Sequence, residues 1–173
     1  AKCNPPMRSR ENVDALWEYV FDGTIDTLGS DHGPYADEEK VKHGNFFKEY
    51  SGFGGYDAML AGMLTEGVHK RGLPLERLAA LTSGNPARVM GLAPRKGSLL
   101  PGTDADIAVV DLDAEWVFDG TKSLSKTKSS HNIYHGSHLK GKVEQTWVRG
   151  ELIYDHGTIK AARGYGRFVA KQK

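Results

Sequence analysis

The apolar positions in the first part of the chain change from helical to strand spacing. Residues 11–20 place their apolar side chains on one face of a helix, and Ser9 is in position to act as its N-cap. Residues 24–30 mix β-branched and apolar side chains over the length of a strand. A helix followed by a buried strand is typical of an α/β unit with a parallel sheet, in which chemistry lies at the carboxyl ends of the strands.

The middle of the chain has a helical pattern after a long aperiodic stretch. Residues 31–55 combine charges, glycines and aromatic side chains without a period, which predicts a long loop of the functional or disordered kind. Residues 56–71 have helical spacing, with Gly72 as the expected C-cap. Two further short helices are predicted over residues 74–81 and 86–90, because a proline opens each of them.

The pattern in the last third of the chain predicts a β-sheet. Strands are predicted over residues 107–110 and 115–118, after a Pro-Gly turn at positions 101 and 102. Residues 121–141 are polar and basic, which predicts a loop. Two alternating runs then flank Arg149-Gly150, which is a hairpin signal.

The amino-acid composition indicates which kinds of partner and which cellular compartment to expect. Lys and Arg total 23 against 22 Asp and Glu, so the chain has no net field that would attract nucleic acid or an anionic membrane, and we expect neither as a partner. A single cysteine, Cys3, excludes an internal disulfide framework and is compatible with the cytoplasm, where we expect the protein. No apolar run approaches the roughly 20 residues of a membrane span. The opening at Ala1, without Met, suggests a truncated chain.

Asp31 is the sharpest candidate for chemistry. It follows the predicted strand directly and precedes Gly33 and Pro34, at the point where barrel enzymes place metal ligands and general bases. An aspartate just after a strand is more often a cap or turn residue, so spacing alone leaves both roles open. The neighbouring His32 has the same two alternatives, because it could line a cleft or form hydrogen bonds within the loop.

Three other patterns point more weakly to a site. His131, His135 and His138 could share a metal, but their surroundings disfavour the helix that would align them, and no Cys or carboxylate nearby completes a ligand set. Residues 52–55 are glycine-rich without the features of a phosphate loop, so a tight backbone approach is expected there. A solvated loop, and not a nucleic-acid surface, is expected for the lysines at positions 122, 126, 128, 140 and 142.

Several longer motifs occur in the order found in one enzyme family. They are KCNPPMRS, DGTIDTLGSDHGP, GFGGYDAML, TEGVHKRGL, LTSGNPARVMGL, RKGSLLPGTDADIAVVDLDAEW and WVRGELIYDHG. Together they resemble the C-terminal part of the cyclic amidohydrolases, the hydantoinase, dihydropyrimidinase and allantoinase group, over essentially the whole chain.

The resemblance implies an α/β fold made of the last two β/α units of a TIM-type barrel of eight such units, followed by helices and a small C-terminal β-sandwich portion. Residues 2–4 would end the seventh barrel strand and residues 24–30 would form the eighth. The implied division is a barrel part at residues 1–92 and a β-sandwich portion with the C-terminal tail at residues 93–173.

The resemblance also assigns roles to two residues. Asp31 matches the family aspartate that ligates the more buried of two divalent metal ions, with zinc the expected metal. As general base it would take a proton from the bridging water and pass it to the leaving nitrogen. Asn4 matches a substrate-binding position whose backbone contacts the ring amide. The other metal ligands of the family lie upstream of residue 1 in this pattern.

The function implied is metal-dependent hydrolysis of a cyclic amide C–N bond by a full-length protein. Hydantoin, dihydropyrimidine and allantoin rings are the expected small-molecule substrates, and relatives are commonly homotetramers. We expect residues 1–173 alone to be inert, because two of about eight strands cannot close a barrel. The alternative is a non-enzymatic, dihydropyrimidinase-like scaffold protein, and Asp31 in an intact Ser-Asp-His context favours the enzyme. The helical half disfavours a third possibility, a free-standing β-rich binding module.

Overall fold

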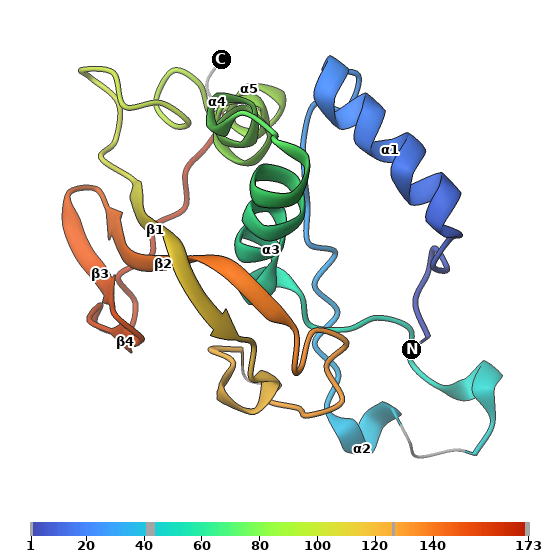
Figure 1. Ribbon diagram of the computed structural model, residues 1–173. Coiled ribbons are helices and arrows are strands. Elements are labelled where there is room, and N and C mark those ends of the chain that lie inside the picture. The colour runs from blue at the N-terminus through green and yellow to red at the C-terminus, as the bar shows by residue number, and fades with distance from the viewer. Residues whose placement is uncertain (1, 41–43, 126, 172–173) are drawn as a thin grey trace.

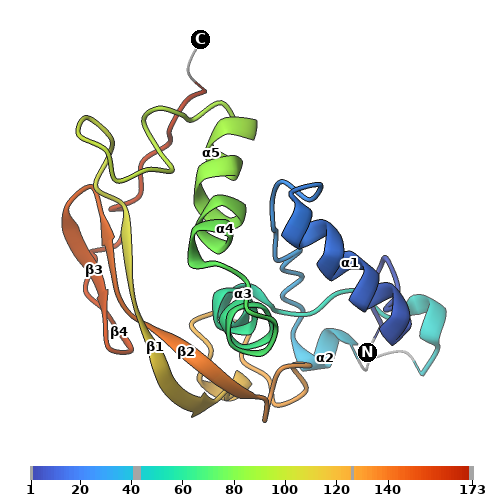
Figure 2. The same cartoon turned by 45° about the horizontal axis from the view of Figure 1, so that its top comes forward.

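The protein consists of a sheet, a column of helices on one face of it, and a further helix beyond that column. The structure is a computed structural model that describes residues 2–40, 44–125 and 127–171. Figure 1 shows the sheet beside the column, and Figure 2 shows that α1 (Arg10–Asp22) lies on the side of the column away from the sheet. The described strands form one antiparallel sheet in the order β1 (Ile107–Val117), β2 (His138–Val148), β3 (Glu151–Asp155) and β4 (Thr158–Ile159). These elements confirm an α/β fold.

Helix α1 forms where the sequence predicts it. The hydroxyl oxygen of Ser9 accepts a hydrogen bond from the backbone of Asn12, and the helix ends at Gly23 with a left-handed φ of 94°. Trp17 and Val20 pack against the core of the column. Leu16 on the same helix is 51% exposed, so α1 buries only part of its apolar surface here.

The central helix also confirms its prediction. Helix α3 (Tyr56–Met63) continues into the π-helical segment η2 (Leu64–His69). The run ends at Gly72, which has a φ of +70° and donates its backbone N–H to the carbonyl of Val68. Two short helical segments, α2 (Asp37–Lys40) and η1 (Phe46–Lys48), lie in the preceding loop, which was expected to be irregular throughout.

The two short helices predicted at residues 74–81 and 86–90 are a single helical run, so the expected break between them is wrong. The run consists of α4 (Leu75–Ala79), π-helical η3 (Ala80–Gly84) and α5 (Asn85–Val89). Pro86 cannot donate to the preceding turn, and its ring would crowd a regular α-helix. The π-helical turn directly before Pro86 widens the backbone at that point, which lets the helix continue.

Residues 24–30 do not form the predicted strand, and residues 2–4 are not in a strand either. A strand requires a neighbouring strand to pair with, and no described segment pairs with these residues in a sheet. The backbone N–H of Leu28 instead donates to the carbonyl of Leu81 in η3, at 3.1 Å. Figure 1 shows the segment after α1 running beside the helical column.

The sheet differs from prediction at its first two strands. Strand β1 (Ile107–Val117) replaces the two strands expected at 107–110 and 115–118, because an irregularity between Asp111 and Glu115 bends the strand without ending it. Strand β2 (His138–Val148) begins within the predicted loop 121–141, and η4 (Gly120–Lys122) lies at the start of that loop. The sheet ends with β3 (Glu151–Asp155) and β4 (Thr158–Ile159).

The predicted hairpin at Arg149-Gly150 is confirmed. These residues have φ values of 51° and 79°, as the two central positions of a type I′ turn require. They connect β2 to β3, which pair in antiparallel register.

The core lies between the helical column and the sheet. One buried cluster consists of Ala58, Ala61, Phe118 and Leu139, and the other of Leu64, Leu73, Leu78 and Leu81. Gly141 in β2 marks the closest approach, since a Cβ atom there would lie 2.8 Å from a side-chain carbon of Leu64. The sheet and η2 are therefore in direct van der Waals contact.

Within the described ranges, no helix has both the length and the apolar character that a membrane crossing requires.

Candidate functional site

Asp31 lies immediately after the segment that the sequence marked as a strand, at a left-handed backbone position that we call the Asp31 turn. Its φ is +44°, a left-handed conformation that aspartate tolerates better than most residues. The side chain is exposed and makes no hydrogen bond to any described residue. The carboxylate is therefore open to a ligand from outside the described part of the chain.

His32 connects this turn to the helical column. Its Nδ1 accepts a hydrogen bond of 3.1 Å from the backbone N–H of Gly55, the N-cap residue of α3. Its ring also meets the ring of Tyr56 edge to face, with 4.4 Å between the ring centres. His32 therefore forms a hydrogen bond within the site, which is one of the two alternatives that the sequence left open.

The glycine-rich residues 52–55 form the expected close backbone approach. The N–H of Gly33 donates to the carbonyl of Phe53 at 3.0 Å, and a Cβ atom on Gly33 would lie 3.2 Å from the Cα of Gly52. Gly52 itself has a φ of +127°, which glycine adopts without strain. The run therefore lets the two ends of the Asp31 loop cross, and no part of it follows a strand as a phosphate loop would.

The N-terminal segment is attached to the same crossing point. The carbonyl of Lys2 accepts a hydrogen bond of 3.0 Å from Gly52, and the Lys2 amine donates to the carbonyls of Phe46 and Glu49 at 2.7 and 2.6 Å. Asn4 is exposed two residues later, before a cis peptide bond to Pro5. The segments that carry Asn4 and Asp31 thus share Gly52 as a common neighbour.

A segment from the sheet part covers the loop after Asp31. We call residues 119–125 and 127–137 the strap. The Thr127 hydroxyl donates to the carbonyl of Pro34 at 2.9 Å, and the Asn132 amide donates to the carbonyl of Gly54 at 3.0 Å. The Ser123 hydroxyl and the Leu124 N–H both bond to the carboxylate of Asp57. The strap is thus a loop, as the sequence predicts, and several of its polar side chains attach it to the rest of the protein.

Asp37 is the charged contact of the strap. Ser129 donates its hydroxyl proton to one carboxylate oxygen, and the Nδ1 of His131 lies 3.0 Å from the other. The hydrogen bond from Ser129, followed by that from His131, lowers the pKa of the Asp37 carboxyl below its usual value. No motif in the sequence marks Asp37, since its partners lie more than 90 residues away.

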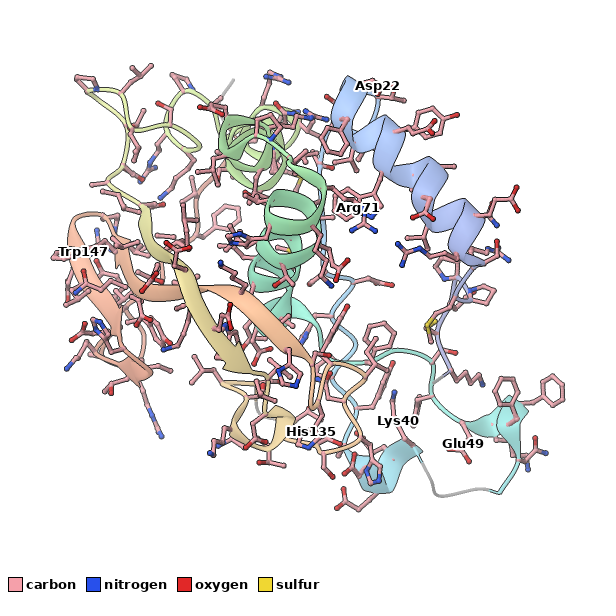
Figure 3. All side chains as sticks on the ribbon, viewed as in Figure 1. Asp22, Lys40, Glu49, Arg71, His135 and Trp147 are labelled. Carbon is pink, nitrogen blue, oxygen red and sulfur yellow. The ribbon has the colours of Figure 1, made fainter. Side chains whose placement is uncertain are left out.

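The three histidines of the strap region do not assemble. His131 bonds to Asp37, while the Nδ1 of His135 accepts from the backbone of Gly120 at 3.2 Å. His138 begins β2, and Figure 3 shows His135 in the loop before that strand. Among residues 2–40, 44–125 and 127–171, no three His, Cys, Asp or Glu side chains are grouped to hold a metal ion.

The lysines of this region do not form a single surface. Lys122 and Lys128 are exposed, whereas Lys140 lies 3.5 Å from Asp113 and Lys142 lies 3.1 Å from Glu144. Lys126 lies outside the described residues. Carboxylates thus offset part of the positive charge.

An apolar groove on the described surface does not include Asp31. It has a volume of about 1020 Å³ and lies between the α4–α5 run and β1. Leucine, alanine, methionine and isoleucine side chains make up most of its wall, including Leu78, Met90 and Ile107. The groove therefore presents an apolar surface, and the candidate catalytic carboxylate lies outside it, at the Asp31 turn.

Comparison with known proteins supports the implied family. A model of the amidohydrolase family matches residues 2–153. The chain is 39% identical over 173 residues to an allantoinase of Rubrobacter xylanophilus and 39% identical over 160 residues to a dihydroorotase of Elusimicrobium minutum. These matches cover 100% and 92% of this chain but only 37% and 35% of the relatives. The chain thus spans little more than a third of their length.

A solved structure agrees with the sequence matches. The L-hydantoinase (dihydropyrimidinase) of Arthrobacter aurescens superposes with a TM-score of 0.90 at 38% identity, over 96% of this chain and 37% of that one. The likeness extends through the helical column and the sheet alike, because nearly all of the chain is covered. This chain therefore belongs to the amidohydrolase family.

Proposed function

We propose that the full-length protein hydrolyses a C–N bond in a cyclic amide. The observation that carries this proposal is Asp31, an exposed carboxylate without a described hydrogen-bond partner, held in a left-handed turn within a Ser-Asp-His-Gly-Pro sequence. The relatives named allantoinase, dihydroorotase and L-hydantoinase support ring opening as the reaction class. Allantoin, hydantoin and dihydropyrimidine rings are the proposed substrates.

A metal centre fits Asp31 only as one ligand among several. The described residues offer a single free carboxylate at this turn and no group of three ligands, and the proposal takes the remaining ligands from elsewhere in the full-length protein. Two divalent ions, zinc in this proposal, would lower the pKa of a bound water and polarise the scissile carbonyl. An exposed, unpaired carboxylate has the free lone pairs that ligation needs.

Asp31 is also the general base of the proposed reaction. One carboxylate oxygen takes the proton of the attacking water, and the same oxygen later gives it to the leaving ring nitrogen. The nitrogen leaves as a neutral amide, and the carboxylate returns to its starting state. The backbone of Asn4 would bind the ring amide, and the hydrogen bond between Gly52 and Lys2 would hold this segment beside the Asp31 turn.

The proposed architecture assigns residues 1–92 to a TIM-type barrel and residues 93–173 to a β-sandwich portion with its tail. No described segment pairs as a strand with residues 2–4 or 24–30, and this supports the assignment, because other barrel strands would supply such a partner. We also propose a cytoplasmic homotetramer. The single cysteine and the exposed apolar side chains of α1 support these two assignments.

The test compares Asp31→Asn with Asp26→Asn in the full-length, metal-loaded protein. Asp26 is an exposed aspartate on the same segment, so its variant controls for loss of a charge. We expect Asp31→Asn to lower kcat for ring opening of hydantoin, dihydrouracil, allantoin or dihydroorotate by about 10²- to 10⁴-fold. Asp26→Asn should leave kcat unchanged. Residues 1–173 alone should show no turnover.

The same measurement tests the non-enzymatic alternative. A full-length wild-type protein that binds no divalent metal and opens none of these rings would contradict the proposal. That result would favour a scaffold protein, the reading in which Asp31 is retained without its partners.

A further inference from the structure

The ring of His32 bonds on both of its nitrogen atoms. Nδ1 accepts from the N–H of Gly55, so the proton of the neutral ring lies on Nε2. Nε2 lies 3.5 Å from the hydroxyl oxygen of Ser125, which can therefore accept that proton as a hydrogen bond. One imidazole thus connects the start of α3 to the strap.

Ser125 is a fixed partner for this contact. It is 7% exposed, its N–H donates to the Ser123 hydroxyl oxygen at 3.0 Å, and its own oxygen accepts from the N–H of Thr127 at 3.2 Å. Ser123 in turn donates to Asp57 in the first turn of α3. His32 therefore sits between two groups that are themselves held by the helix.

Asp31 lacks such contacts of its own. Its side chain makes no hydrogen bond to a described residue, and its left-handed φ is one that most residues avoid. The surrounding structure helps to hold an uncommon backbone conformation of this kind in place. The neighbouring groups that hydrogen bonds hold in place are the ring of His32, which bonds to Gly55, and the backbone of Gly33, which bonds to Phe53.

We infer that His32 is a positioning residue that sets the direction of the Asp31 carboxylate through its hydrogen bonds to Gly55 and Ser125. This inference rests on the proposed function, since it assigns His32 a part in the same reaction. It also gives the sheet part of the chain a role in catalysis, because Ser125 belongs to the strap. His32 itself does not touch the substrate in this assignment.

The two hydrogen bonds can be removed separately in the full-length, metal-loaded protein. His32→Asn retains an acceptor near the position of Nδ1 but is too short to reach Ser125. His32→Gln retains a donor near the position of Nε2 but withdraws the acceptor from Gly55. His32→Ala removes both, and Ser125→Ala removes the second partner only. His69→Ala is the matched control, because His69 bonds to the carbonyl of Leu112, on another part of the molecule.

We expect His32→Ala to lower kcat by about 100-fold, the effect of displacing a reacting group by an ångström, while KM changes little. His32→Asn should recover most of kcat, and Ser125→Ala should lower it severalfold. His69→Ala should behave as wild type. A His32→Ala protein that retains wild-type kcat, or that changes only KM, would overturn the inference.

Crystal structures of the same variants give a readout that does not depend on activity. In wild type, φ of Asp31 should lie in the left-handed region, and in His32→Ala it should leave that region or the carboxylate should rotate. An unchanged Asp31 in His32→Ala would overturn the inference even in a protein without turnover. If His32→Ala does not fold, the same comparison is made with His32→Gln and Ser125→Ala. If the wild-type protein has no activity but Asp31 is displaced in His32→Ala, the proposed function is contradicted and the positioning role of His32 is not.

Discussion

The side-chain amide of Asn85 donates a hydrogen bond of 2.8 Å to the backbone carbonyl of Asp26. Asn85 is 8% exposed and opens α5, whereas Asp26 lies in the segment that leads to Asp31. A second bond, from the N–H of Leu28 to the carbonyl of Leu81, joins the same two parts of the chain. The segment before the catalytic candidate is therefore attached to the helix by polar contacts in place of strand pairing.

Replacing Asn85 tests how much this attachment contributes. Asn85→Ala leaves the carbonyl of Asp26 without its donor in a half-buried setting, so we expect the free energy of unfolding to fall by about 1–3 kcal/mol. Asn12→Ala is the control, because Asn12 is exposed and bonds only within the cap of α1. Urea denaturation measures both. Equal effects of the two substitutions would show that the Asp26 contact adds nothing.

Thr65 joins η2 to the sheet through one buried hydroxyl. The hydroxyl donates its proton to the carbonyl of Ala61 at 2.7 Å, and its oxygen accepts from the N–H of Lys140 in β2 at 2.9 Å. Thr65→Val keeps the shape but leaves that N–H unpaired, so we expect a loss of about 1–3 kcal/mol. Thr82→Val is the matched control, since its hydroxyl bonds only to its own helix at Leu78. If the two variants unfold at the same urea concentration, the bond to β2 has no net value.

Gly141 and Gly157 separate a steric effect from a conformational one. They have nearly equal φ values of 93° and 90°, but only Gly141 has a neighbour, Leu64, within reach of a Cβ atom. Gly157→Ala should cost about 1–2 kcal/mol for the left-handed backbone. Gly141→Ala should cost about 1–3 kcal/mol more, because it also overpacks the core. Thermal unfolding of both variants measures the difference. Equal losses of stability would mean that the Leu64 side chain moves aside without an energetic penalty.

The hydrogen bonds of Asp37 predict that the stability of the folded protein depends on pH in the acid range. Its hydrogen bonds to Ser129 and then His131 lower the pKa of the carboxyl in the folded protein, so the ionised form is favoured by folding. This contribution is fully present above the unfolded pKa of about 3.9 and is lost as pH falls through the lower folded value. We expect Asp37→Asn to reduce stability at pH 6 and to flatten the decline below pH 4.

The control for that experiment is Glu38→Gln, because Glu38 is an exposed carboxylate of the same short helix. Stability is measured by urea denaturation at a series of pH values. A slope below pH 4 that is the same in wild type and Asp37→Asn would show that the strap contact does not contribute to acid unfolding.

Local signals in the sequence were sufficient for the elements that depend on local geometry. The helix over residues 56–71 and its end at Gly72 follow from apolar spacing and from one residue that accepts a positive φ. The hairpin at Arg149-Gly150 follows from the same preference. In these cases the determining interactions lie within a few residues of one another.

The sequence was misleading where distant residues decide the structure. Residues 24–30 have strand composition, but pairing depends on a neighbour that composition does not provide. Residues 121–141 have loop composition, yet the strap bonds to Pro34, Asp37 and Gly54, about 80 to 90 residues away. The position of Asp31 was marked by its motif, whereas the contacts that hold His32 were visible only in the structure.

The crossing at Gly52 has a consequence for how this family can diversify. The amine of Lys40 donates to the carbonyl of Gly52, so these two residues meet at the base of an excursion whose described part is residues 44–51; Figure 3 shows Lys40 at the end of α2. Loops closed at their base tolerate insertions cheaply. The tip carries Phe46 and Phe47, which are 64% and 90% exposed. Insertions and substitutions at this tip can therefore accumulate in relatives without moving the Asp31 turn.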